Sequence, residues 1–442
     1  MTADPTIYQR PAELLQNLIR FNTTNPPGNE TECIKYARDL LEAAGFEVQM
    51  PAKDAARANL VTRLNGRGDA PPLLLQGHVD VVTAENQTWQ QPPFAGNLVD
   101  GWVWGRGALD MKGGVTMLIC AMLRAKMEGF TPPGDVILAL LADEEAGSDY
   151  GSTYLVKEHA HLFEGVRYAI GEFGGFSMYV AGGKFYPIMV AERQGCPLKV
   201  TVRGPGGHGA QPMQGGAMAR LAKMLTSLDE NLLPVHITPV VKQMVEAMAS
   251  ALPEQAASMF RQVIDPSQTD TVLDHLGNGG RTIRPLVRNT VNATIISGGT
   301  KINVIPSEIV VQLDGRLLPG YQPDDLVNEV RAIIGSEPEI EVVKFSPGTP
   351  PPDMTHFDTL AQILREADPQ GTAIPYVVSG GTDASVFSDL GIQTYGFLPM
   401  NLPMSFNFGA TVHGADERIP VDALEFGVAA VYQAVQRLGA DM

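Results

Sequence analysis

Cysteine is scarce in this chain: only Cys33, Cys120 and Cys196 occur among its 442 residues. Three cysteines cannot build the disulfide framework of a small secreted domain, so the composition fits a reducing compartment. Cys120 lies in an apolar, helix-like stretch, where a buried thiol is expected rather than a nucleophile. The sequence also lacks a Gly-x-Ser-x-Gly motif. A thiol or serine hydrolase is therefore disfavoured.

Long apolar runs are also missing. The stretch at 115–123, among the longest, is much shorter than the roughly 20 residues that a membrane helix needs. Residues 1–10 have no basic segment followed by an apolar one, so no signal peptide is expected. These two absences predict a soluble, cytoplasmic protein.

Basic residues are in the minority, with 32 Lys and Arg against 49 Asp and Glu and a net charge of −17. Such acidity argues against nucleic acid and against an anionic membrane as partners. The apolar content of 44% and the charged content of 18% are typical of a globular protein. A chain of 442 residues is too long for one ordinary domain, so we expect two.

The two ends of the chain alternate between strand and helix patterns. Apolar runs at 72–76 and 135–142 predict buried strands, and 112–128 predicts a helix between them. Alternation of this kind indicates a mostly parallel sheet with helices on both faces.

The middle of the chain has a different pattern, with strands and helices in separate groups, as in a smaller α+β unit. We therefore expect an α/β domain formed by 1–192 and 317–442, interrupted by an inserted domain at 193–316. The segment 241–274 adds helical material rich in Met and Ala, to which the sequence assigns no role.

Seven His, Asp and Glu residues end or closely follow apolar segments or lie in glycine-rich turns. They are His78, Asp80, Asp110, Glu144, Glu145, Glu172 and His413. The carboxyl ends of the strands face the ligand crevice in an open α/β sheet. Imidazole and carboxylate ligands without thiolate suit catalytic zinc, and also cobalt or manganese. The set predicts a centre for two divalent metal ions, with zinc favoured.

A two-metal centre needs a bridging carboxylate, terminal ligands and a base. Asp110 is the natural bridge, since glycines around it let the backbone fold tightly about an ion. Asp80 lies two residues after His78 in an extended segment, so it points the same way and could orient the imidazole. Glu144 and Glu145 are adjacent and point apart, so one can bind metal while the other accepts a proton from a metal-bound water.

Three motifs together resemble one known family. They are Gly-His-Val-Asp-Val-Val at 77–82, Gly-Arg-Gly-Ala-Leu-Asp-Met-Lys-Gly-Gly at 105–114 and Asp-Glu-Glu at 143–145. The family is the di-zinc metallopeptidases, which include aminoacylase, acetylornithine deacetylase, succinyl-diaminopimelate desuccinylase and glutamate carboxypeptidase. Similar motifs at 22–28, 206–209, 303–306, 314–316 and 380–383 extend the resemblance over nearly the whole chain.

The resemblance implies a role for each candidate. His78 and Glu172 correspond to ligands of one zinc ion, Asp110 to the bridge, and Glu145 and His413 to ligands of the other. Glu144 corresponds to the general base, and Asp80 to the residue that supports His78.

In this family the inserted domain is a lid and often a dimerisation surface. His208 resembles the lid histidine that stabilises the oxyanion, in many members that of the opposite subunit. Asn303 resembles an asparagine that contacts substrate. Arg316 resembles the arginine that binds the substrate carboxylate, a task for which a planar guanidinium is suited. Gly380 and Gly381 resemble a loop whose backbone approaches the substrate.

The implied enzyme is a metallohydrolase that cleaves the amide bond of an N-acyl amino acid or a short peptide with a free carboxylate. It would use a metal-bridged water and Glu144 as base. Alternatives are a dipeptidase or carboxypeptidase, a carbamoyl or ureido amidohydrolase on the same fold, and a non-catalytic binding protein. The last is disfavoured because every ligand and the base are present. The expected partners are a small-molecule substrate and a second copy of the chain.

Overall fold

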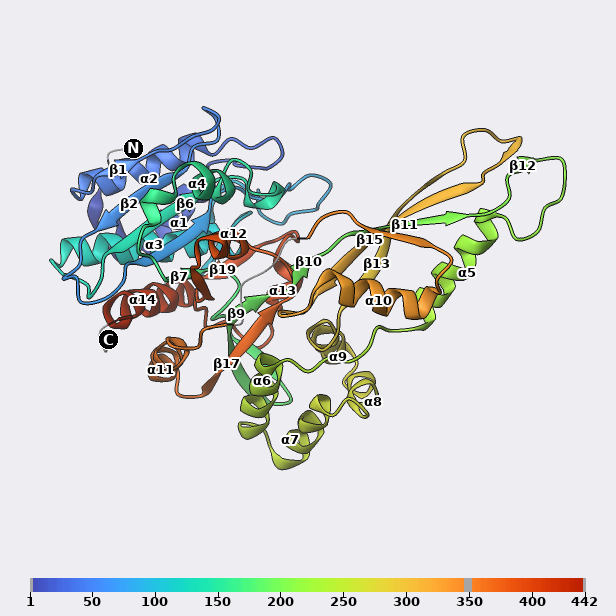
Figure 1. Cartoon of the computed structure of the whole chain (residues 1–442). Coiled ribbons are helices and arrows are strands. Elements are labelled where there is room, and N and C mark those ends of the chain that lie inside the picture. The colour runs from blue at the N-terminus through green and yellow to red at the C-terminus, as the bar shows by residue number, and fades with distance from the viewer. Residues whose placement is uncertain (1–2, 346–351, 440–442) are drawn as a thin grey trace.

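The computed structural model describes residues 3–345 and 352–439; the other residues of the predicted domain ranges lie outside the described part. It has a larger body and a smaller, elongated one, each built around its own sheet (Figure 1). None of the helices in the described ranges combines the length and the apolar content of a membrane span.

Two central strands of the larger sheet send their side chains alternately into two cores. In β3 (Leu73–His78), Leu75 joins one apolar cluster and Leu74 joins another. In β6 (Val136–Leu141), Leu138 joins the first of these clusters and Ile137 joins the second. Successive residues of a strand face opposite sides, so continuous apolar runs mark strands that are covered on both faces.

The larger sheet is parallel through its centre, where β6, β3, β7 and β18 are neighbours. Antiparallel pairings occur on both sides of this centre. The order is β1 (Val48–Gln49), β2 (Leu60–Leu64), β6, β3, β7 (Tyr168–Gly171), β18 (Gln393–Gly396), β9 (Gly183–Glu192) and β17 (Gly371–Val378), and β8 (Met178–Val180) pairs with β9. The predicted α/β class with a mostly parallel sheet is confirmed.

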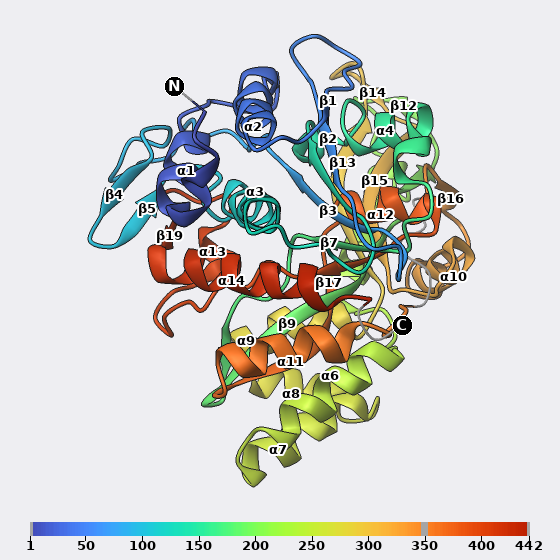
Figure 2. The ribbon, with the colours of Figure 1, turned by 90° about the vertical axis from the view of Figure 1, so that its left-hand side faces the viewer.

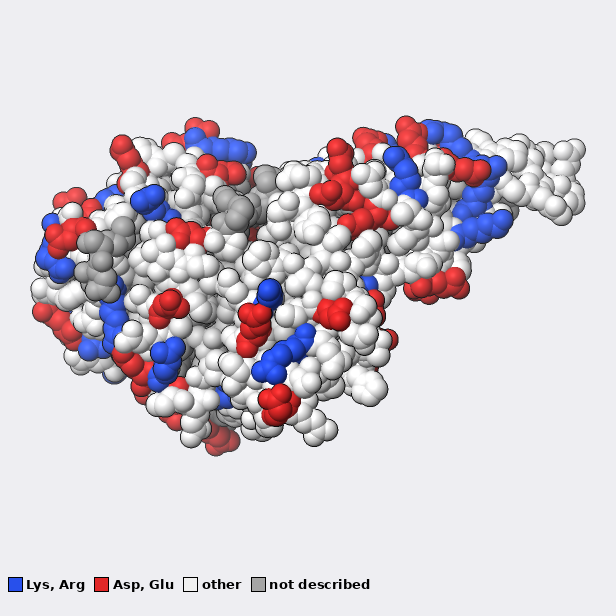
Figure 3. All heavy atoms as spheres, turned by 60° about the horizontal axis from the view of Figure 1, so that its bottom comes forward, with Lys and Arg blue, Asp and Glu red and all other residues white. Residues whose placement is uncertain are grey.

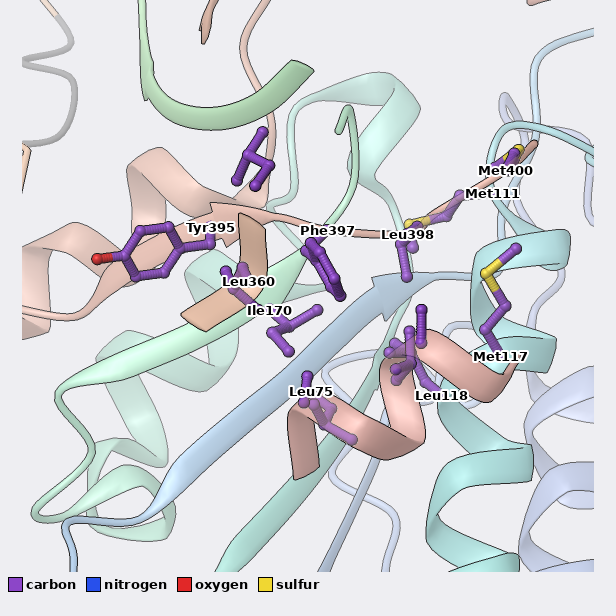
Figure 4. Packing of buried hydrophobic residues seen from close by; sticks show 14 of the residues in the cluster. Leu75, Met111, Met117, Leu118, Ile170, Leu360, Tyr395, Phe397, Leu398 and Met400 are labelled. Carbon is purple, nitrogen blue, oxygen red and sulfur yellow. The ribbon is translucent and has the colours of Figure 1, made fainter. Parts of the chain in front are cut away.

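Helices cover both faces of this sheet (Figure 2). One face carries α1 (Pro11–Ile19), α3 (Lys112–Met127), α11 (Phe357–Ala367) and α14 (Val421–Arg437), and the other carries α4 (Ser152–Glu158) and α12 (Asp383–Phe387). α2 (Thr31–Ala43) contacts β1. The α3 helix is buried almost all round, as an apolar central helix should be. Figure 4 shows part of this core, where Leu75, Ile170 and Phe397 gather.

The smaller sheet is antiparallel and has helices packed against it. Its strands are β10 (Gln194–Gly195), β15 (Glu308–Leu317), β11 (Leu198–Arg203), β16 (Glu339–Val342) and β13 (Thr290–Gly298). The helices α5 (Ala217–Glu230) and α10 (Pro323–Ile334) share an apolar core with it. The short pair β12 (Gly207–His208) and β14 (Val304–Ile305) lies at its outer end (Figure 1). This is the expected α+β arrangement.

The packing differs in two places from the expected insertion at 193–316. The helices α6 (Pro239–Ser250), α7 (Glu254–Arg261), α8 (Thr269–His275) and α9 (Asn278–Ile283) belong to the core of the larger body, where α6 packs on β17. The elements α10 and β16 belong to the smaller body. An apolar face on α6, with Val241, Met244 and Met248 all buried, is covered by the larger sheet.

The connections between the bodies are hydrogen-bonded to one another. Arg193, between β9 and β10, donates from Nη2 to the carbonyl of Arg316 at 2.8 Å and to Thr290 Oγ1 at 2.8 Å. Val235 forms an isolated antiparallel bridge with Arg288. Four segments far apart in the sequence, at 193, 235, 288–290 and 316, therefore meet at one place between the two sheets.

The packing of α6 predicts that its buried face stabilises the larger body. Met244→Ala should lower the free energy of unfolding by about 2–5 kcal/mol, because it removes a buried side chain and leaves a cavity. Gln243→Ala on the exposed face is the matched control and should change it by less than about 0.5 kcal/mol. Urea unfolding measures both, and equal effects would show that α6 is not part of that core.

Candidate metal centre

Two groups of ligand atoms share one carboxylate. His78, Asp110 and Glu172 have atoms within 4.8 Å of one another, and so do Asp110, Glu145 and His413. Asp110 Oδ1 lies 3.2 Å from His78 Nε2, and Asp110 Oδ2 lies 2.9 Å from His413 Nε2. One carboxylate thus faces two imidazoles with its two oxygens, which is the arrangement of a bridging ligand.

Three of the five ligands come from the carboxyl ends of neighbouring parallel strands. His78 is the last residue of β3, and Glu172 directly follows β7, its neighbour in the sheet. Glu145 lies in a single helical turn at 144–146, shortly after β6. His413 follows α13 (Phe408–Thr411) from the far end of the chain. Parallel order therefore collects residues that are distant in sequence at one sheet edge.

Glu144 lies beside the ligands without belonging to either group. Its Oε2 is 3.9 Å from His78 Nε2, and its side chain is 15% exposed. Asp80 holds the turn that carries it: the Asp80 carboxylate accepts the backbone N–H of Glu144 and of Glu145, each at 3.1 Å. His78 Nδ1 lies 3.0 Å from the backbone oxygen of Asp80 and 3.5 Å from its carboxylate. Asp80 therefore supports both the imidazole and the Glu turn, and the sequence indicated only the first.

The buried carboxylates of this centre favour the binding of cations. Burial, with Asp110 and Asp383 nearby, raises the pKa of Glu172 to about 7. Hydrogen bonds with Asp110 and then Glu145 raise the pKa of His413 to about 10. Glu145 Oε1 is buried and lies 3.4 Å from His413 Nε2, without a hydrogen bond of good geometry. Crowded buried carboxylates are stabilised by divalent cations. The nitrogen and oxygen donors fit zinc, cobalt or manganese.

A buried glutamate, Glu417, joins two ligand-bearing loops. Its carboxylate accepts the backbone N–H of Gly107 at 2.9 Å, of Leu109 at 2.7 Å and of Asp110 at 3.0 Å. It also pairs with Arg106 at 2.7 Å, and Arg106 Nη2 donates to the carbonyl of His413 at 3.2 Å. Outside this network, β19 (Arg418–Pro420) pairs with β5 (Trp102–Trp104), which pairs with β4 (Asn97–Val99). The loop of the bridge and the loop of the last ligand are thus fixed together.

A second network supports the centre from the amino-terminal side. The Asn25 side chain donates to Asp80 and to Asp143, each at 2.9 Å. Arg57 pairs with Asp143 at 2.8 Å and with Glu30 at 2.6 Å, and all three side chains are buried. Apart from Asp80, the sequence analysis gave these residues no role, although the loop that contains Asn25 and the Asp-Glu-Glu motif that contains Asp143 were both recognised.

The predicted lid residues lie apart from the metal ligands. His208 and Asn303 are exposed neighbours, since the N–H of Gly209 donates to the carbonyl of Asn303 at 2.9 Å. They belong to the outer end of the smaller body, at β12, which lies far from β7 in Figure 1. Arg316 lies on β15, beside Arg193, where the chain crosses from the larger to the smaller body. Its side chain pairs with Asp314 at 2.9 Å.

The Gly380–Gly381 pair follows β17 and is exposed. The next residue, Thr382, hydrogen-bonds through its hydroxyl to the buried Glu192 and caps α12. Asp383 is buried and accepts hydrogen bonds from Ser148 at 2.8 Å and Ser152 at 2.5 Å. Glu192 and Asp383 were missed, although Asp383 closes a recognised motif.

Fold and ligand geometry together define a metal-dependent hydrolase of the peptidase type. The chain belongs to Peptidase family M20/M25/M40, whose family model matches residues 74–437. The predicted family and the predicted enzyme class are confirmed.

Curated relatives match most of the chain. Probable carboxypeptidase S-like 2 of Dictyostelium discoideum is 26% identical over 438 residues, covering 92% of this chain and 82% of the relative. Succinyl-diaminopimelate desuccinylase of Paracoccus denitrificans is 30% identical and covers 77% and 85%. The human N-fatty-acyl-amino acid synthase/hydrolase PM20D1 is 25% identical and covers 84% and 74%.

Solved structures share the fold. A metallo-carboxypeptidase of the M20 family from Sulfolobus solfataricus, Sso-CP2, has a TM-score of 0.66 at 16% identity, covering 97% of this chain and 99% of that one. Human carnosine dipeptidase 1 has a TM-score of 0.64 at 16% identity and covers 99% and 97%. The YXEP protein of Bacillus subtilis, described as a dinuclear metal-binding peptidase, has a TM-score of 0.63 at 14% identity, covering 99% and 100%.

The Glu417 network predicts an effect on metal affinity. In Glu417→Gln an amide replaces one carboxylate oxygen and faces backbone N–H groups, so the Asp110 loop loses acceptors. We expect zinc affinity to fall about 10–100-fold, as for other residues that orient ligands. Glu366→Gln, which alters exposed contacts with Arg437 and Gln362, is the control and should bind normally. Competition with a chromophoric chelator measures the affinity; an unchanged value would contradict the orienting role.

Proposed function

We propose that this protein is a two-metal amidohydrolase that cleaves an N-acyl amino acid or a short peptide carrying a free carboxylate. The supporting observation is the bridging geometry of Asp110, with one oxygen toward each of two imidazoles and Glu144 beside them. We assign His78, Asp110 and Glu172 to one ion and Asp110, Glu145 and His413 to the other.

The residues of this chain would divide the chemistry among them. When bound, the two ions would polarise the scissile carbonyl and make an attacking water more acidic. Glu144 accepts a proton from the water while the oxygen of that water bonds to the carbonyl carbon. The same carboxyl then gives the proton to the leaving nitrogen as the C–N bond breaks, so that an acid and an amine leave. The N–H bonds to Asp80 keep the Glu144 backbone in place through both steps.

Arg316 is proposed to bind the substrate carboxylate. Its Nε and Nη2 donate to Asp314, which fixes the plane of the guanidinium and leaves other N–H groups for a ligand. Asn303 would contact the substrate from the lid, and the backbone at Gly380 and Gly381 from the loop after β17.

His208 is proposed to stabilise the oxyanion, and it must reach the metal centre from the lid. In Figure 3 the outer end of the smaller body is free of Lys, Arg, Asp and Glu side chains in that view. Ile295 and Ile296 of β13 are 51% and 55% exposed, and in the described residues β13 pairs only with β15. A free apolar strand edge is a surface on which a second copy can pair. We propose a homodimer through this edge, with His208 delivered by the partner subunit or by closure.

The role of Glu144 is tested with Glu144→Gln. The variant should keep two equivalents of zinc but lose about 10²-fold or more in kcat on N-acyl amino acids, since a neutral amide cannot accept the proton. Glu158→Gln, at an exposed position of α4, is the control. Chelation should abolish wild-type activity and added zinc restore it. Near-normal turnover of a fully loaded Glu144→Gln enzyme would refute the assignment.

The role of His208 is tested with His208→Ala, alone and mixed with Glu144→Gln subunits. The single variant should lose roughly 10²–10³-fold in kcat, as expected when an oxyanion donor is removed. If His208 acts across a dimer, refolding the two inactive variants together should restore part of the activity, because one mixed site carries both wild-type residues. No recovery would favour closure within one subunit, and an unaffected kcat in His208→Ala would eliminate the oxyanion role.

A further inference from the structure

The turn that carries Glu144 begins and ends at residues with a strained backbone. Asp143 and Ser148 have φ of 70° and 63°, in the left-handed region that residues other than glycine seldom adopt. The N–H of Ser148 donates to the carbonyl of Asp143 at 2.6 Å and so closes the turn. Residues persist in this region only where the surrounding structure holds them. The turn therefore needs support from other segments.

Two buried carboxylates give this support, one at each end of the turn. Asp80 binds the N–H groups at its beginning. Asp383 binds its end, since its Oδ1 accepts the hydroxyl of Ser148 at 2.8 Å and that of Ser152 at 2.5 Å. Ser152 is the first residue of α4, which packs against α12, the helix that begins at Asp383 (Figure 2). One carboxylate oxygen thus fixes both the end of the turn and the start of the next helix.

Asp383 is also close enough to the proposed base to act on its charge. Burial and then the negative charge of Glu172 raise the pKa of Glu144 well above its usual value, and the charge of Asp383 adds a smaller rise. The start of α12 therefore lies near the carboxylates of the metal centre.

The residues just before α12 are anchored as well. Thr382 donates its hydroxyl to the buried carboxylate of Glu192, the last residue of β9. The N–H of Arg193 donates at 3.0 Å to the carbonyl of Val378, the last residue of β17. The loop at 379–381 is therefore held at both ends, between the crossing to the smaller body and α12.

This loop contains two glycines that the fold does not require. Neither Gly380 nor Gly381 has a positive φ, and a Cβ added at either would meet no atom of the described residues within 4 Å. Both residues are exposed. Glycine with an ordinary φ and open space around it suits the close approach of a ligand to the backbone. This agrees with the proposed contact between the loop and the substrate.

We propose that Asp383 is a positioning residue for Glu144, which it holds through the hydroxyls of Ser148 and Ser152, and that it joins the base to the substrate loop at 380–381. The inference rests on the proposed function, since it takes Glu144 as the base. Asp383 acts through the backbone of the turn and keeps the Glu144 carboxylate directed at the attacking water. Its loss should therefore lower kcat and leave KM nearly unchanged, because Thr382 still anchors the loop.

The first experiment separates the hydrogen bonds of Asp383 from its charge. Asp383→Ala should lower kcat on N-acyl amino acids about 10–100-fold, because a small misplacement of a catalytic group slows the reaction strongly. KM and a content of two zinc equivalents should stay near wild type. Asp383→Asn loses the charge but keeps an oxygen that can accept both hydroxyls, so it should restore most of kcat. An Asn variant as impaired as the Ala variant would overturn the positioning role.

The second experiment is a double-mutant cycle, which also serves if Asp383→Ala fails to fold. The pair Ser148→Ala and Ser152→Ala should lower kcat as Asp383→Ala does. Adding Asp383→Ala to that pair should change kcat little, because both changes remove the same contact. Independent, multiplicative losses would overturn the proposal, as would normal kcat in the serine pair. Ser385→Ala is the control in the same helix: its hydroxyl donates to the carbonyl of Thr382, and kcat should stay normal.

A third measurement does not depend on turnover. Hydrogen–deuterium exchange of the segment 143–153 should be faster in Asp383→Ala and close to wild type in Asp383→Asn and Ser385→Ala, because lost support lets the turn open more often. Unchanged exchange in Asp383→Ala would overturn the support of the turn and leave the proposed function intact. If the zinc-loaded wild-type enzyme hydrolyses no N-acyl amino acid or dipeptide, the proposed function fails, and the role of Asp383 in catalysis fails with it.

Discussion

One buried carboxylate, that of Glu417, joins the two parts of the chain from which the proposed metal centre is built. It binds three backbone N–H groups of the loop that carries Asp110, and it lies four residues after His413. Its bonds span more than 300 residues of sequence. The larger sheet brings strand ends together, but this carboxylate fixes the bridge relative to the last ligand. The centre therefore requires both ends of the larger body to be folded.

Much of the site could be predicted from the sequence because its signals are local. Apolar runs that end in His or Glu, and an Asp surrounded by glycines, identify residues at strand ends and in tight turns. The structure brings His78, Asp110, Glu145, Glu172 and His413 into two groups that share one residue. The order of the parallel strands, which the alternating pattern indicated only in general, places them side by side.

The remainder depended on packing that no local pattern specifies. The apolar face of α6 fits a lid or a sheet equally well, and only the contacts with β17 decide between them. The strand β9 was not predicted; Pro187 lies within it, and proline is uncommon inside strands. The bonds between Asp80 and the turn at 144–145 could not be inferred either, since that turn lies 64 residues away in the sequence.

Several connections between the two bodies meet at Arg193, and this affects how the bodies can move when a substrate binds. Because α6 to α9 return to the larger body, the chain passes between the two bodies more often than a simple insertion would require. Three of these passages, at Arg193, Val235 and Arg288, are hydrogen-bonded to one another, and Arg193 also bonds to the carbonyl of Arg316 on β15. Segments joined at one place act as a pivot, and points near a pivot move less than points far from it. A turn of the smaller body about this place would therefore move a ligand on Arg316 little and His208, at the far end, the most.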